Sequence, residues 1–111
     1  MNKNELTGKK CKPCEGGVPA LTQPEIDKLM AQLNGWVQSG PVITKDFNFK
    51  NYYQTIAFVN AVAWLSHRED HHPDLHVGYN KCSVEYSTHS VGGLSDNDFI
   101  CAAKVDALFG I

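Results

Sequence analysis

Histidines are concentrated in one short stretch of the sequence, HREDHHP at residues 67–73. Four of the five histidines lie in or just after it (His67, His71, His72 and His76), and His89 follows further along the chain. An imidazole titrates at about pH 6.5, so a group of them can donate and accept protons at neutral pH. The pattern indicates general acid/base chemistry; the competing interpretation is a solvated, charged helix end.

Pro73 predicts where the helix that carries the histidine pair stops. Proline disfavours helical geometry at the preceding residue, so a helix arriving from the N-terminal side should end near His72. His71 and His72 would then lie at a helix C-terminus, whose dipole favours the protonated ring. This position suits a general acid.

A second group with possible chemistry is the pair in Cys11-Lys-Pro-Cys14. A closed zinc site needs four ligands, and the sequence has no second Cys-x-x-Cys pair, because Cys82 and Cys101 stand alone. A redox role would need a thioredoxin-like pattern, which is absent. We interpret the pair as structural or incidental and expect no metal, with a metal site shared with His71 and His72 as an alternative.

The bulk properties limit the possible classes of protein. A chain of 111 residues is typical of one domain, and 42% hydrophobic residues without a long apolar run predict a globular protein with no membrane span. A net charge of −2 with no basic stripe argues against nucleic-acid binding.

Composition also divides the chain into two parts. Residues 1–20 are polar, rich in Gly, Pro and Lys and without periodicity, which predicts a flexible or loosely docked N-terminal arm. Residues 21–111 are expected to form a single domain. The opening residues lack the apolar segment of a signal peptide, so we expect a cytoplasmic location with reduced cysteines.

Helix signals and period-2 alternation predict seven elements over the second part. Thr22 and Glu25 form a capping box, Asn34-Gly35 ends that helix, and Ser95 with Asp98 opens the last one. The predicted helices span 22–34, 51–70 and 95–109, and the predicted strands span 36–39, 43–49, 75–79 and 82–88. The apolar face of the long helix is expected to comprise Tyr52, Tyr53, Ile56, Ala57, Val59, Asn60, Ala63 and Trp64.

The order of these elements is α-β-β-α-β-β-α. Strands joined by hairpins predict an α+β fold, a four-stranded antiparallel sheet with three helices packed on one face. Such a sheet leaves its edges open, and pairing of two copies would cover them.

From the first helix to the last, residues 21–109, the chain resembles the pterin-4a-carbinolamine dehydratases. The resemblance rests on spaced residues: His67, His71-His72-Pro73, Tyr79-Asn80-Lys81, His89, and Gly93-Leu94-Ser95 before Asp98. Two positions depart from the family pattern, which often has an acidic residue in place of His67 and a Trp in place of Leu75. Neither departure removes a proton-transfer group.

The resemblance implies dehydration of 4a-hydroxytetrahydropterin to quinonoid dihydropterin, a lyase reaction without a cofactor that recycles the pterin of aromatic amino-acid hydroxylases. It implies His71 and His89 as general acid and base, with His72 binding the pterin and stabilising developing charge. Asp98 would belong to the substrate-binding set, and would orient a histidine or cap a helix. Tyr79 would line the pocket or belong to the core. His67 and His76 are expected at the surface.

The resemblance also implies partners: a homodimer or homotetramer, and a functional link to phenylalanine hydroxylase. Animal relatives of the fold also serve as dimerisation cofactors of a homeodomain transcription factor, so a non-catalytic binding module is the alternative function. A complete set of three histidines, His71, His72 and His89, favours the enzyme.

Overall fold

The computed structural model describes residues 3–12 and 19–108 of the chain. Its helices are α1 (Lys3–Thr7), α2 (Gln23–Met30), α3 (Tyr52–Glu69) and α4 (Asp96–Ala107), with a 3-10 turn, η1 (His89–Val91). Its strands are β1 (Val37–Ser39), β2 (Val42–Asn48), β3 (Asp74–Val77) and β4 (Lys81–Tyr86). The predicted order of elements is confirmed, with α1 and η1 as additions.

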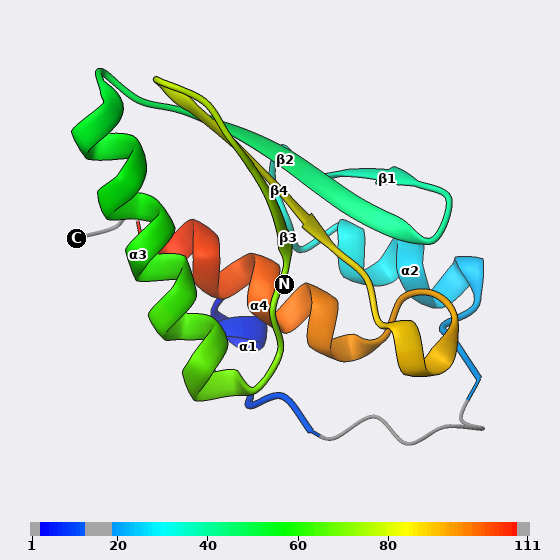
Figure 1. The fold of residues 1–111 in the computed structure, drawn as a ribbon. Coiled ribbons are helices and arrows are strands. Elements are labelled where there is room, and N and C mark those ends of the chain that lie inside the picture. Colours follow the sequence, from blue (N-terminus) through cyan, green and yellow to red (C-terminus); the bar gives the residue numbers. More distant parts are fainter. Residues whose placement is uncertain (1–2, 13–18, 109–111) are drawn as a thin grey trace.

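The strands form one four-stranded sheet in the order β1-β2-β4-β3, and every neighbouring pair is antiparallel. In the register of the central pair, Ile43 lies opposite Tyr86 and Phe47 opposite Cys82. Because side chains alternate along a strand, these four residues share one face, and all four are buried. Helices α2, α3 and α4 lie on one side of the sheet (Figure 1). The α+β fold with helices on one face is confirmed.

Helix α4 is the central element of the core. Nearly all its residues from Asn97 to Asp106 are buried, including Phe99 and Val105, which have no exposed surface. It packs against α3 and against α1, so it has neighbours on several sides. A helix buried all round needs few polar residues, and the polar ones that α4 does bury must find partners.

The predicted face of α3 is largely wrong, although Val59 packs against the core as expected. The residues of this helix that pack into the core are Thr55, Phe58, Val62 and Glu69, whereas Tyr53 and Trp64 are 80% and 63% exposed. The helix carries apolar residues around most of its circumference, so its periodicity alone does not select one face. Packing of Phe58 against Phe47 and Phe49 sets the orientation.

The ends of the helices follow their capping signals. Thr22 and Glu25 form the predicted capping box of α2, and Ser95 and Asp98 form that of α4. Helix α2 ends at Met30, one turn earlier than predicted, while Gly35 has the left-handed φ of 81° that the sequence indicated.

The part of the N-terminal arm that the structure describes, residues 3–12, is docked rather than loose. It contains α1, which packs on α4 and buries Leu6 to 1% exposure. Residues 13–18, which include Cys14, lie outside the described residues. In the described part of the chain, no helix combines the length and apolar character needed to cross a bilayer.

Candidate active site

The histidine pair lies immediately after the end of α3, as Pro73 predicts. The helix ends at Glu69, and Asp70 adopts left-handed geometry with φ 52° and ψ 42°. The N–H groups of Asp70 and His71 both donate to the carbonyl of Ser66. This turn redirects the chain toward β3, so that His71 and His72 leave the helix surface and face the sheet.

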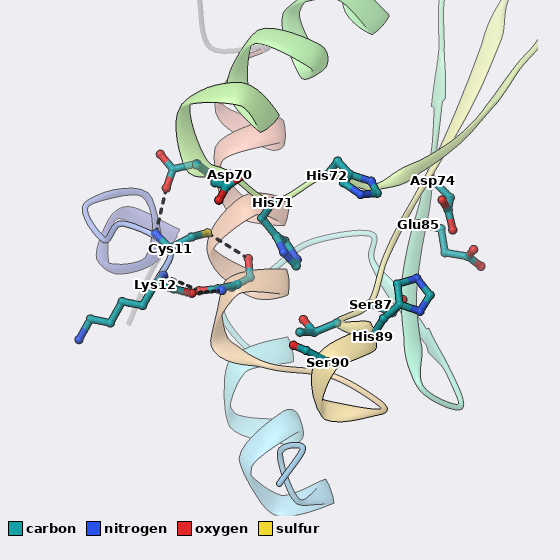
Figure 2. A pocket seen from close by; sticks show the side chains of 13 residues that line it. Cys11, Lys12, Asp70, His71, His72, Asp74, Glu85, Ser87, His89 and Ser90 are labelled. Carbon is teal, nitrogen blue, oxygen red and sulfur yellow. Dashed lines mark hydrogen bonds between the residues drawn. The ribbon is translucent and has the colours of Figure 1, made fainter. Parts of the chain in front are cut away.

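These residues line a cleft of about 380 Å³. Its walls come from the end of α3, the start of β3, the end of β4, η1, the start of α4 and the docked N-terminal segment: Cys11, Lys12, Glu69, Asp70, His71, His72, Asp74, Glu85, Ser87, Thr88, His89, Ser90 and Asn97. Figure 2 shows the three histidines around one opening, with the ammonium of Lys12 pointing away from them. The volume falls within the range of small-molecule sites, about 300–1,000 Å³.

His71 is held by a buried carboxylate. Its Nε2 lies 2.7 Å from Oδ1 of Asp98, whose side chain has no exposed surface. Because Nε2 is committed to Asp98, any proton exchange between His71 and a ligand must use Nδ1. The arrangement fixes both the position and the tautomer of the neutral ring.

Asp98 is itself fixed by two donors on its other oxygen. Oδ2 accepts the Thr88 hydroxyl at 2.8 Å and the Ser95 N–H at 2.9 Å. The N–H is the capping-box contact at the start of α4, where the helix dipole also favours a carboxylate. Asp98 therefore caps a helix and orients a histidine, the two roles considered for it.

Tyr86 supports the ring of His71 from β4. The two rings are stacked, with centroids 5.8 Å apart and planes inclined by 9°. Burial raises the pKa of the Tyr86 phenol, so the ring stays neutral in the physiological range. His71 is thus restrained by a hydrogen bond at one edge and by an aromatic face.

His72 and His89 are less constrained. Both side chains are exposed, His72 next to Pro73 and His89 at the start of η1. They are 17 positions apart in the sequence, and the strand pair β3–β4 brings them to the same end of the sheet. The expectation that His71, His72 and His89 reach one cleft agrees with the geometry.

Other residues singled out in the sequence lie elsewhere. Tyr79 is 65% exposed, in the turn at the opposite end of the β3–β4 hairpin, and does not line the cleft. The predicted strands 75–79 and 82–88 already place Tyr79 at the turn end of the hairpin, whereas His72 and His89 flank its other end. His67 packs against Trp64 on the outer side of α3, with ring centroids 5.3 Å apart, and His76 is exposed on β3.

Sequence reasoning missed the buried Glu69 and Asn97 at the cleft wall. Glu69 accepts the Cys11 N–H and the Lys104 ammonium, both at 2.9 Å. Burial alone would raise its pKa, but these donors and the positive charge of Lys104 hold the pKa below its ordinary value. The position of Glu69 at a helix end, next to Asp70, could have marked it as a candidate. Its partners lie 35 and 58 residues away in the sequence, so the local pattern does not reveal them.

The alternative of a metal site is not supported by the side chains of residues 3–12 and 19–108. No cluster of three or more His, Cys, Asp or Glu side chains in these ranges is arranged to hold an ion. Cys14, which that alternative also requires, is outside the described residues. Imidazoles with a carboxylate partner are instead suited to proton transfer.

The fold and cleft therefore define an α+β domain with a cleft lined by three histidines. Comparison with known proteins identifies it further: the chain belongs to the pterin 4 alpha carbinolamine dehydratase family, whose model matches residues 19–108. A Nitrosospira multiformis protein, provisionally named a pterin-4-alpha-carbinolamine dehydratase, is 68% identical, with 97% of this chain and 96% of the relative covered. A Bdellovibrio bacteriovorus protein with the same provisional name is 56% identical, with 99% and 92% covered.

Two solved structures are also similar. A transcriptional coactivator/pterin dehydratase from Brucella melitensis is 32% identical and superposes with a TM-score of 0.75, covering 80% of this chain and 97% of that one. A pterin dehydratase-like protein, identified as a RuBisCO assembly factor in the alpha-carboxysome, is 32% identical with a TM-score of 0.56, covering 68% and 87%.

Proposed function

We propose that this protein dehydrates 4a-hydroxytetrahydropterin to quinonoid dihydropterin. The observation that carries the proposal is one cleft that contains His71, His72 and His89, with His71 held by the buried Asp98. Family membership supplies the substrate class, and the residues supply a chemistry that fits it. A single-step dehydration transfers no electrons, so the histidines can carry the reaction.

The chemical task is a pair of proton transfers. Hydroxide is a poor leaving group, so an acid must protonate the 4a oxygen as the carbon–oxygen bond breaks. A base must accept a proton from the pterin ring, so that the electron pair left behind forms the new double bond. Water and the quinonoid dihydropterin are the products, and the two protein groups exchange their protonation states.

His71 and His89 are the groups we assign to these transfers. His71 is fixed by Asp98 and Tyr86 and presents Nδ1, whereas His89 approaches from η1, a separate element. Groups on separate elements can address different edges of one bicyclic ligand. His72, which neither Asp98 nor Tyr86 restrains, is assigned to binding the pterin and stabilising charge.

The biological setting proposed here follows from the reaction. The product is the oxidised form that a reductase must return to tetrahydropterin, which places the enzyme after an aromatic amino-acid hydroxylase such as phenylalanine hydroxylase. A cytoplasmic homo-oligomer is part of the proposal. The open edge strand β3 and the exposed aromatic side chains Tyr53 and Trp64 on α3 support self-association.

A second candidate function is that of a binding module. The similar structures are described as a transcriptional coactivator/pterin dehydratase and as a RuBisCO assembly factor, so the fold also serves proteins that bind other proteins. The exposed aromatic side chains of α3 would suit such a role. The intact histidine cleft favours catalysis, because a binding module has no need for it.

Turnover of chemically generated 4a-hydroxytetrahydropterin distinguishes the two. The substrate decays without a catalyst, so the measured quantity is the decay rate above that background as a function of protein concentration. We expect a linear increase with the wild-type protein and none with a folded His71→Ala/His89→Ala double variant. Equal decay with and without wild-type protein would leave the binding module as the function.

A further inference from the structure

Two cysteines far apart in the sequence lie side by side next to the cleft. The sulfur atoms of Cys11 and Cys101 are 3.3 Å apart, although 90 residues separate them along the chain. A disulfide needs a sulfur–sulfur distance of about 2.05 Å, so the two atoms would have to approach by only about 1.3 Å.

The backbone around Cys11 is held in place by hydrogen bonds that do not involve its sulfur. The Cys11 N–H donates to Glu69 Oε1 at 2.9 Å. Lys12 exchanges two hydrogen bonds with the Asn97 side chain, at 3.0 Å and 2.6 Å. Together with the burial of Leu6, these contacts seat residues 3–12 on α4. The folded protein therefore holds the two thiols next to each other, and their contact does not depend on random motion of residues 3–12.

The two thiols differ in access. Cys11 is half-buried and lines the cleft, so a small oxidant can reach it. Cys101 has no exposed surface, and its hydrogen bond to Cys11 together with burial raises the pKa of its thiol. Oxidation should therefore begin at Cys11, with Cys101 as the thiol that reacts with the oxidised sulfur.

We propose that Cys11 and Cys101 are a redox modification site that forms an intramolecular disulfide under mild peroxide oxidation. The Cys11 thiolate attacks a peroxide oxygen, the O–O bond breaks, and Cys11 sulfenic acid and water form. The Cys101 sulfur then attacks the Cys11 sulfur, the S–O bond breaks, and a second water leaves. Two thiols and one hydrogen peroxide give one disulfide and two waters, and an added dithiol reverses the reaction.

The consequence is a covalent link between residues 3–12 and α4. Cys101 lies one turn after Asp98 on that helix, so the link secures the cleft wall that Cys11 and Lys12 form. Closing a long loop removes conformational freedom from the unfolded chain. The oxidised protein should therefore melt at a higher temperature than the reduced one.

The other two cysteines provide matched controls. Cys82 is buried in β4 with its thiol near the Ser83 carbonyl, and Cys14 is the competing partner by its spacing from Cys11. The test uses the full chain, reduced, freed of reductant and treated with hydrogen peroxide. Remaining thiols are then alkylated, and the protein is digested without reduction and mapped by mass spectrometry.

We expect the peptides that contain Cys11 and Cys101 to be linked in the wild type and in the Cys14→Ser and Cys82→Ser variants. The link should be absent in Cys11→Ser and Cys101→Ser. If Cys101→Ser does not fold, Cys11→Ser alone serves as the negative control. Oxidation should raise the melting temperature of Cys14→Ser by roughly 10 °C and leave that of Cys11→Ser unchanged. A Cys11–Cys14 link, an intermolecular disulfide, or alkylated Cys101 beside over-oxidised Cys11 would overturn the proposal.

Discussion

Helix α4 buries one aspartate near each end, and the two have different partners. Near the N-terminus, Asp98 contacts His71 at 2.7 Å, with Thr88 and Ser95 as further donors. Near the C-terminus, Asp106 accepts the Lys45 ammonium at 2.9 Å and the Trp36 indole N–H at 3.0 Å. Both carboxylates are satisfied, but only Asp98 contacts an imidazole that also lines the cleft.

The difference separates an ion pair within the core from a carboxylate–imidazole pair beside the cleft. Neither Lys45 nor Trp36 lines the cleft, so the pair at the C-terminal end of α4 has no ligand to act on. The helix dipole disfavours a carboxylate there, and Lys45 offsets it, whereas the dipole favours Asp98 at the other end. A buried carboxylate marks a site for chemistry when its partner is an imidazole that also lines a cleft.

Removal of the titratable partner should give the largest effect. We expect His71→Ala to lower kcat for carbinolamine dehydration by roughly 10²–10⁴-fold, the usual contribution of a positioned proton-transfer group. His89→Ala should fall in the same range. Both are measured against freshly generated substrate after subtraction of the uncatalysed rate.

Two matched variants test whether that loss is specific. His67→Ala removes a histidine that packs on Trp64 outside the cleft and should retain wild-type kcat. Lys45→Met removes the partner of the other aspartate and should lower stability without lowering kcat of the folded fraction. Near-normal kcat in both His71→Ala and His89→Ala would show that the cleft is not the acid/base site.

Exchange of each aspartate for asparagine tests the comparison directly. Asp98→Asn keeps an acceptor for Thr88 and Ser95 but removes the charge that orients His71, so kcat should fall by roughly 10–100-fold with KM little changed. Asp106→Asn weakens the contacts to Lys45 and Trp36 and should cost about 1.5–3 kcal/mol of stability with kcat unchanged. Steady-state kinetics and urea unfolding of both variants provide the measurements, and equal kcat in the two would contradict the distinction.

Much of the fold was predictable because its signals are local. Capping boxes at Thr22 and Ser95, period-2 alternation and Pro73 depend on residues a few positions apart, and each was confirmed. The orientation of α3 was not predictable, since it depends on which apolar side chain meets Phe47 and Phe49 across the core. Local pattern determines that a helix forms, and tertiary packing determines which side it buries.

The candidate site divides in the same way. His71, His72, His89 and Asp98 were found through spacing and resemblance, and the structure places all but the buried Asp98 along the lining of the cleft. Tyr79 belonged to the same pattern but lies at the far turn of the hairpin. The contacts that dock residues 3–12 escaped prediction, because the low hydrophobicity of the segment gives no sign of the buried Leu6 or of backbone contacts to Glu69 and Asn97.

A smaller effect is expected at the histidine that has no buried carboxylate. His72 is exposed, and its Nδ1 lies 3.4 Å from the Pro73 carbonyl. If it binds the pterin equally in the ground and transition states, His72→Ala should raise KM roughly fivefold, the value of one hydrogen bond, and leave kcat near wild type. A loss of kcat as large as that of His71→Ala would move His72 into the proton-transfer set.

The smallest effect concerns a third buried carboxylate beside α4, Glu69, which pairs with Lys104 and with the Cys11 N–H. Glu69→Gln keeps an acceptor for the N–H but removes the charge, and should cost about 1 kcal/mol at pH 7. Because the folded pKa of Glu69 lies below its ordinary value of 4.5, its charge stabilises the protein above that pH. The stabilisation is lost as pH falls through the folded pKa.

The difference in unfolding free energy between wild type and Glu69→Gln should therefore shrink as the pH is lowered below 4.5. Urea unfolding at a series of pH values measures it, and carboxylates common to both proteins cancel in the difference. Glu5→Gln, which changes an exposed carboxylate on the same docked segment, should show a difference near zero throughout. A Glu69→Gln difference that stays constant or grows on acidification would mean that the charge of Glu69 does not hold the N-terminal segment and Lys104 together.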